Sequence, residues 1–124
     1  MITAIGVDIV DVARIRRLMD RHGMRFVSRV LGQRETTLLG SRHDAAQFVA
    51  GRFAAKEALV KAFGQYLTER PGFSQIEILA DSAGRPCVAC GFPASDALSS
   101  VQMLVSISHE KSYAVAMAIL SEEK

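Results

Sequence analysis

Hydrophobic residues recur at helical spacing through most of the first half of the chain and alternate in the second half. We expect helical segments over residues 12–21, 24–31 and 44–63, with a helical turn or a loop over 34–41. Asp11 and Asp44 are placed to cap the first and the longest of these helices, and Gly64 is placed to end the longest.

Short apolar runs, several of them rich in β-branched residues, predict the strands. We expect strands over residues 3–7, 76–80, 87–90, 103–108 and 113–120. The first should end at Asp8, a turn over 81–86 should join the second to the third, and a short helix over 94–99 follows. The pattern predicts an α+β fold, with an antiparallel sheet packed against one long helix.

The last predicted strand carries two contrasting faces. The small face consists of Ala114, Ala116 and Ala118, and a helix can lie close to it. The large face consists of Tyr113, Val115, Met117 and Ile119. Because neither face carries charged residues, we expect both to be buried.

The bulk composition indicates a globular protein. Of 124 residues, 49% are hydrophobic and 23% are charged, which suits one domain over residues 1–124. No apolar run is as long as a membrane span, and no basic residues precede the apolar N-terminal stretch, unlike in a signal peptide. We therefore expect a cytoplasmic protein that does not enter the membrane.

Two cysteines, Cys87 and Cys90, form a C-x-x-C on a predicted strand. Residues three apart on a strand point to opposite faces, and no second cysteine pair is present. We interpret both as packing thiols.

Positive charge is concentrated near the N-terminus, although the net charge is only +2. Residues 11–34 contain seven arginines and two aspartates. Arginine binds carboxylates and phosphates through its planar fork. The cluster alone fits a solvated helix face, nucleic acid or an acidic protein; the absence of tryptophan and of a nucleic-acid-binding motif argues against nucleic acid.

Two carboxylates occur against apolar backgrounds. Glu57 faces apolar positions of the longest helix, where burial is costly unless Lys61 or a metal ion neutralises the charge. Asp8 ends an apolar strand and could instead cap the following turn. Two carboxylates with free coordination positions suit Mg²⁺, which takes water and substrate phosphates as its other ligands.

His109 lies at the end of a predicted strand beside Ser106 and Ser108, where a structural role in the turn is the alternative. Three blocks then match a known family in order and spacing. They are IGVDIV at 5–10, RFAAKEA at 52–58 with Lys61, and SISHE at 106–110 leading into YAVA at 113–116. Over nearly its whole length the chain resembles holo-[acyl-carrier-protein] synthase, the short bacterial type of 4′-phosphopantetheinyl transferase.

The resemblance implies transfer of 4′-phosphopantetheine from coenzyme A to a serine of apo acyl carrier protein, with release of adenosine 3′,5′-bisphosphate. It implies that Asp8 and Glu57 hold Mg²⁺ and that Lys61 stabilises the leaving phosphate. Asp8, or a water near the metal, is the implied base. The positions that match contacts to coenzyme A are Lys56, Lys61, His109, the neighbouring Ser106 and Ser108, and the hairpin residues Gly84, Arg85 and Pro86.

The resemblance also implies that an arginine-rich first helix docks the acidic carrier protein, through Arg14, Arg17 and Arg21. It implies a homotrimer with active sites between subunits. The chain departs from the family at Gln65-Tyr66-Leu67, where a second glycine-containing turn is usual. The alternative function is a catalytically silent module that only binds the carrier protein.

Overall fold

The computed structural model describes residues 1–123, with all of their side chains except those of residues 93 and 94. The helices are α1 (Val12–His22), α2 (Met24–Val30), α3 (Gln33–Leu39) and α4 (Ala45–Ala62), with 3₁₀ turns η1 (Phe63–Gln65), η2 (Phe73–Gln75) and η3 (Pro93–Leu98). The strands are β1 (Ile2–Asp11), β2 (Ile76–Ala80), β3 (Pro86–Cys90), β4 (Val101–His109) and β5 (Tyr113–Glu122).

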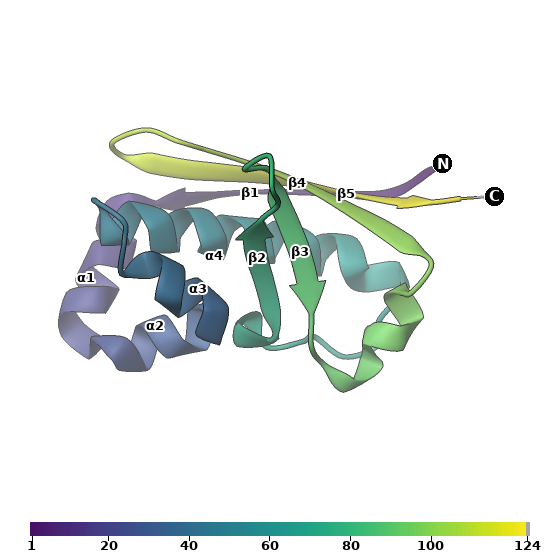
Figure 1. Ribbon diagram of the computed structural model, residues 1–124, viewed down its shortest axis with the longest axis horizontal. Helices are drawn as coiled ribbons and strands as arrows, with labels where there is room; N and C mark the ends of the chain where they lie inside the picture. The colour runs from purple at the N-terminus through teal and green to yellow at the C-terminus, as the bar shows by residue number, and fades with distance from the viewer. Residues whose placement is uncertain (124) are drawn as a thin grey trace.

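The strands form two antiparallel sheets. One has three strands in the order β1-β5-β4, and the other is the β2–β3 hairpin. In Figure 1, α4 runs beneath the three-stranded sheet, and α1, α2 and α3 gather at one end. The α+β class is therefore confirmed, with two sheets where the sequence predicted one. Among residues 1–123, no helix combines the length and apolar composition needed to cross a bilayer.

The predicted helix caps are present, but two helical boundaries differ from prediction. Asp11 accepts from the backbone NH of Ala13 at 2.9 Å, and Asp44 accepts from that of Gln47 at 3.1 Å. Residues 34–41, predicted as a helical turn or a loop, contain most of the helix α3, which begins at Gln33 and ends at Leu39. Gly64 does not end α4, because the chain continues directly into the 3₁₀ turn η1 that contains it.

β1 is longer than the sequence predicted, because it pairs with β5 along its whole length. Asp8 lies opposite Ala116 in mid-strand, and pairing continues to Asp11 opposite Tyr113. Asp8 therefore does not cap a turn. The residue that caps the following element, the helix α1, is Asp11.

The small face of β5 lies against α4, as predicted. Ala114, Ala116 and Ala118 are fully buried there. Gly6 on the neighbouring strand lies so close to α4 that a Cβ would overlap the carbonyl oxygen of Ala58. Small residues thus let the sheet approach the helix backbone closely.

The large face of β5 is not buried within one chain, contrary to prediction. Tyr113 is 51% exposed and Met117 is 46% exposed. This outer face of the three-stranded sheet continues onto β1 and β4 through Ile5, Val7, Ile9 and Leu104, which are also exposed. The sequence could not separate the two faces, because burial by the same chain and burial by a partner leave the same apolar pattern.

The two cysteines are free thiols in different surroundings. Cys87 is exposed, contrary to a packing role, and Cys90 is partly buried next to the sulfur of Met103. Burial raises the pKa of Cys90 to about 11. Its thiol therefore stays protonated at neutral pH.

Candidate functional site

Asp8 and Lys61 meet where β1 crosses α4. Lys61 Nζ donates to Asp8 Oδ1 at 3.1 Å and to the carbonyl of Val7 at 3.0 Å. The alternation of β1 turns Asp8 to the same face as Gly6, toward α4. The close approach at Gly6 thus brings the carboxylate within reach of the lysine.

Glu57 lies on α4 one turn before Lys61, so the two side chains share a helix face. Its side chain is 24% exposed, and its partner is Arg70, whose Nη2 lies 2.6 Å from Glu57 Oε1. The sequence predicted Lys61 or a metal ion as its partner, but Lys61 contacts Asp8. Arg70 was missed because pattern analysis does not show which loop folds back onto a helix.

Asp8 and Glu57 each keep an oxygen that a metal ion could use. Within residues 1–123, Asp8 Oδ2 and Glu57 Oε2 accept no hydrogen bond, so each carboxylate has an oxygen available. No group of three acidic, histidine or cysteine side chains suited to a metal occurs in that range. A two-carboxylate donor set suits Mg²⁺, which commonly keeps water and substrate phosphate as its remaining ligands.

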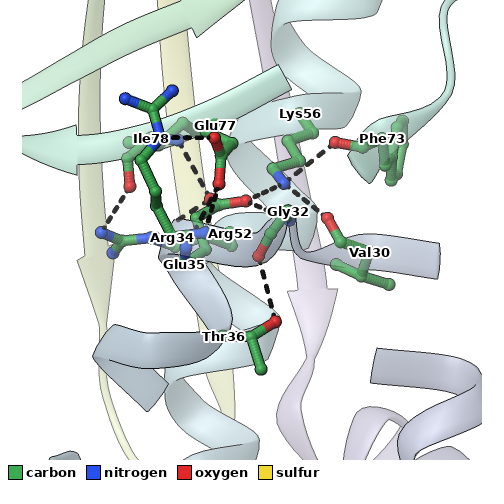
Figure 2. A network of polar contacts seen from close by, with 10 residues as sticks. All are labelled: Val30, Gly32, Arg34, Glu35, Thr36, Arg52, Lys56, Phe73, Glu77 and Ile78. Atoms are coloured by element: carbon green, nitrogen blue, oxygen red, sulfur yellow. Dashed lines mark hydrogen bonds and ion pairs between the residues drawn. The ribbon is translucent and has the colours of Figure 1, made fainter. Parts of the chain in front are cut away.

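Lys56 lies elsewhere, in the buried network of Figure 2. Its ammonium donates to Glu35 Oε1 at 2.5 Å and to the carbonyls of Val30 and Phe73. These acceptors use all three donors, and burial lowers the pKa of Lys56. The prediction that Lys56 contacts phosphates of the cofactor is at odds with this placement.

Glu35 is the centre of that network. Its Oε1 also accepts from the backbone NH of Gly32, and its Oε2 accepts from that of Ile78 at 3.0 Å. Arg52 Nε lies 3.8 Å from Oε2, without a hydrogen bond. The sequence did not single out Glu35, because it lies in a segment predicted only as a helical turn or a loop, where no pattern indicated burial.

His109 borders a groove with a volume of about 270 Å³. The groove is also lined by Arg42, His43 and Arg52, and by Phe48 beneath them. Both guanidinium groups stack on the Phe48 ring, at 4.9 Å for Arg42 and 4.4 Å for Arg52. The groove therefore offers fixed positive charge to an anionic ligand.

Ser106 and Ser108 do not face this groove. Strand alternation places them on the outer face of the sheet, whereas Ile107 and His109 face α4. The prediction that their hydroxyls assist His109 does not hold within one chain. Ser108 and His109 are adjacent in the sequence, but successive side chains of a strand point to opposite faces of the sheet.

Gly84, Arg85 and Pro86 lie at the exposed tip of the β2–β3 hairpin (Figure 1). Gly84 has a φ of 82°, and Asp81 accepts from the backbone NH groups of Ala83 and Arg85. The residues therefore form an ordered turn. No hydrogen bond or ion pair within residues 1–123 joins them to the Asp8–Lys61 pair.

The arginines of α1 are exposed. Arg14, Arg17 and Arg21 point outward, while Val12 and Ile15 are buried beneath them. The positive surface extends onto α2: His22 at the end of α1 and Arg25, Phe26 and Arg29 of α2 line a hollow of about 100 Å³. This face suits an acidic macromolecule.

Known proteins resemble the chain over nearly its full length. Residues 4–118 match the model of the 4′-phosphopantetheinyl transferase superfamily. A holo-[acyl-carrier-protein] synthase of Chlorobium limicola is 44% identical over 96% of this chain and 94% of that protein.

Two solved structures have the same fold. A holo-(acyl-carrier-protein) synthase of Bacillus anthracis, in complex with CoA (3′,5′-ADP), matches with a TM-score of 0.82 and 34% identity over 99% of both chains. The synthase of Neisseria meningitidis matches with a TM-score of 0.87 and 32% identity over 98% of this chain and 100% of that one.

Proposed function

Because the chain belongs to the 4′-phosphopantetheinyl transferase superfamily and resembles its holo-[acyl-carrier-protein] synthases throughout, we propose that it transfers 4′-phosphopantetheine from coenzyme A to a serine of apo acyl carrier protein. The serine oxygen bonds to the phosphorus next to pantetheine, the bridging P–O bond breaks, and adenosine 3′,5′-bisphosphate leaves. The observation that carries this proposal is the Asp8–Lys61 contact, one helical turn from Glu57.

Each side chain at this crossing has a distinct role. Lys61 is half-exposed and donates to Asp8 and Val7, which leaves one ammonium proton for the leaving phosphate. Asp8, or a water that it orders, takes the proton of the serine hydroxyl. Asp8 and Glu57 would hold Mg²⁺, which when bound supplies the positive charge that neutralises the diphosphate.

The basic groove at His109 serves the nucleotide end of coenzyme A. Its two guanidinium groups, stacked on Phe48, suit phosphate recognition. Arg85 and its neighbours at the hairpin tip contact the nucleotide from another subunit or after a shift of the hairpin. Ser106 and Ser108 are left without a role in this groove.

The exposed apolar face of the three-stranded sheet supports a homotrimer. It carries Ile5, Val7, Leu104, Tyr113 and Met117 side by side, and such a contiguous patch marks an interface. Ser106 and Ser108 lie on this same face, so they meet a neighbouring subunit. The arginines of α1 lie on another element and stay free for carrier protein.

The silent carrier-binding module remains the second candidate, because the positive face of α1 would bind carrier protein without catalysis. Incubation of apo acyl carrier protein with this protein, coenzyme A and Mg²⁺ separates the two. We expect a mass gain of one phosphopantetheine group, abolished by EDTA and restored by excess Mg²⁺. Binding without any mass gain, across several carrier proteins, would favour the silent module.

A further inference from the structure

Arg70 has no part in the roles given above, yet it contacts a residue at the centre of the site. Its Nη2 lies 2.6 Å from Glu57 Oε1, the shortest of the ion pairs on the exposed side of α4. Arg70 is 58% exposed, and Glu57 is 24% exposed. The guanidinium thus covers one carboxylate oxygen and keeps other donors toward solvent.

The side chain of Arg70 is held in position by an aromatic ring. Its guanidinium carbon lies 5.2 Å from the centre of the Phe73 ring, and that ring packs edge-on against Phe53 of α4 at 5.3 Å. The carbonyl of Phe73 accepts from buried Lys56 at 3.0 Å (Figure 2). The segment that carries Arg70 is therefore tied to the same helix turn that presents Glu57.

This arrangement differs from an ordinary surface ion pair. Arg85 and Asp81, for example, pair within one turn and contact no aromatic ring among residues 1–123. Arg70 instead spans from a loop to the face of α4 that also presents Lys61. A phosphate bound to Lys61 would therefore lie about one helical turn from the carboxylate that Arg70 contacts.

We propose that Arg70 positions the diphosphate of coenzyme A and, before the substrate binds, competes with the divalent cation for Glu57. This rests on the proposed function. A cation at Glu57 repels the guanidinium, while a phosphate beside it offers oxygens that the fork binds in pairs. Stacking on the Phe73 ring keeps the Arg70 guanidinium in place while its bonding partner changes from the Glu57 carboxylate to the phosphate.

Two measurements test the proposal, the first without any turnover. Mn²⁺ is titrated into the protein in the absence of coenzyme A, and free Mn²⁺ is followed by electron paramagnetic resonance. We expect Arg70→Ala to bind Mn²⁺ about twofold to fivefold more tightly than the unmodified protein, because a competing charge is removed. Glu57→Gln should weaken binding, which confirms that the titration reports this site.

The second measurement is steady-state transfer to carrier protein. We expect Arg70→Ala to raise KM for coenzyme A about tenfold, with a smaller change in kcat. Arg70→Lys keeps the positive charge but loses the planar fork. We therefore expect its Mn²⁺ affinity to equal that of the unmodified protein, and its KM for coenzyme A to lie between those of the unmodified protein and Arg70→Ala. Arg16→Ala is the matched control: it removes a similarly exposed arginine from Asp44 and should alter neither quantity.

The outcomes separate this proposal from the proposed function. If the unmodified protein transfers phosphopantetheine and Arg70→Ala changes neither Mn²⁺ affinity nor KM for coenzyme A, Arg70 only fastens its loop and the proposal is overturned. A lower melting temperature of Arg70→Ala, without a change in either quantity, would overturn it in the same way. Absence of transfer by the unmodified protein would overturn the proposed function as well.

Discussion

Two ion pairs begin at adjacent residues of α4 and lie in opposite surroundings. Lys56 meets Glu35 in the core, where both side chains are fully buried and bonded to backbone groups as well. Glu57 meets Arg70 at the surface, where each carries fewer contacts. The difference shows that the charges of one motif divide between a buried structural network and the exposed surface, according to which side of the helix each faces.

The buried pair should give the largest effect on stability. Lys56→Ala removes the nearest counter-charge of buried Glu35 and leaves only Arg52, 3.8 Å away, so we expect the free energy of unfolding to fall by about 3–5 kcal/mol. Chemical denaturation measures this. The double variant Glu35→Leu/Lys56→Met replaces both charges with apolar groups and should recover part of the loss, because the backbone NH groups of Gly32 and Ile78 lose their acceptor. An equally unstable double variant would contradict the assignment of the loss to the charge of Glu35 without Lys56.

The exposed pairs should show the reverse behaviour. We expect Asp8→Asn and Glu57→Gln to lower the transfer rate by about 100-fold or more, because charge stabilisation at the phosphate is lost. Their free energies of unfolding should stay within about 0.5 kcal/mol of the original. Mass spectrometry of the carrier protein measures the transfer rate, and chemical denaturation measures the free energy of unfolding. Unimpaired transfer in both variants would remove the metal assignment.

Gly6 tests how the exposed site is assembled. In Gly6→Ala the new methyl group meets the carbonyl of Ala58, so β1 must move away from α4. We expect a loss of about 1–3 kcal/mol in stability, together with lower transfer activity as Asp8 leaves Lys61. Gly40→Ala is the control, since its Cβ meets only an ordinary contact at 3.5 Å. Equal stability of the two variants would show that the crossing tolerates a methyl group.

Glu77 connects the buried network to solvent and gives it a dependence on pH. Burial raises its pKa, but hydrogen bonds from Arg34 and from the NH of Glu35 outweigh this and hold the pKa below its ordinary value of 4.5. Its stabilisation is therefore present above pH 4.5 and is lost as pH falls through the lower folded-state pKa. The melting temperature of Glu77→Gln should fall less steeply with decreasing pH than that of the original protein. An unchanged slope of melting temperature against pH would exclude Glu77 as the source of the acid dependence.

The smallest effect should come from α1, which lies apart from both pairs. We expect Arg14→Glu to raise KM for carrier protein about fivefold, mainly through slower association, and to leave KM for coenzyme A nearly unchanged. The effect should shrink at high salt. Steady-state kinetics at two salt concentrations measure it. An equal rise in KM for coenzyme A would place Arg14 at the phosphate site instead.

Much of the fold could be read from local patterns. The caps at Asp11 and Asp44, the long central helix and the alanine face of β5 all follow from neighbouring residues alone. The resemblance in turn selected Asp8, Glu57 and Lys61, and the structure brings Asp8 and Lys61 into contact. These features depend on interactions between neighbouring residues or on motifs, and both can be recognised in the sequence.

The partners of the charged side chains, in contrast, are defined by the packing of the folded chain. Lys56 and Glu57 are adjacent residues, yet Lys56 turns toward Glu35, which lies in a different helix, and Glu57 turns toward a loop that ends at Phe73. Strand pleating likewise separated His109 from Ser108. The order of residues establishes which side chains can carry charge and which elements hold them. Burial and pairing depend on contacts between segments far apart in the chain, and these exist only once the helix and sheet have packed.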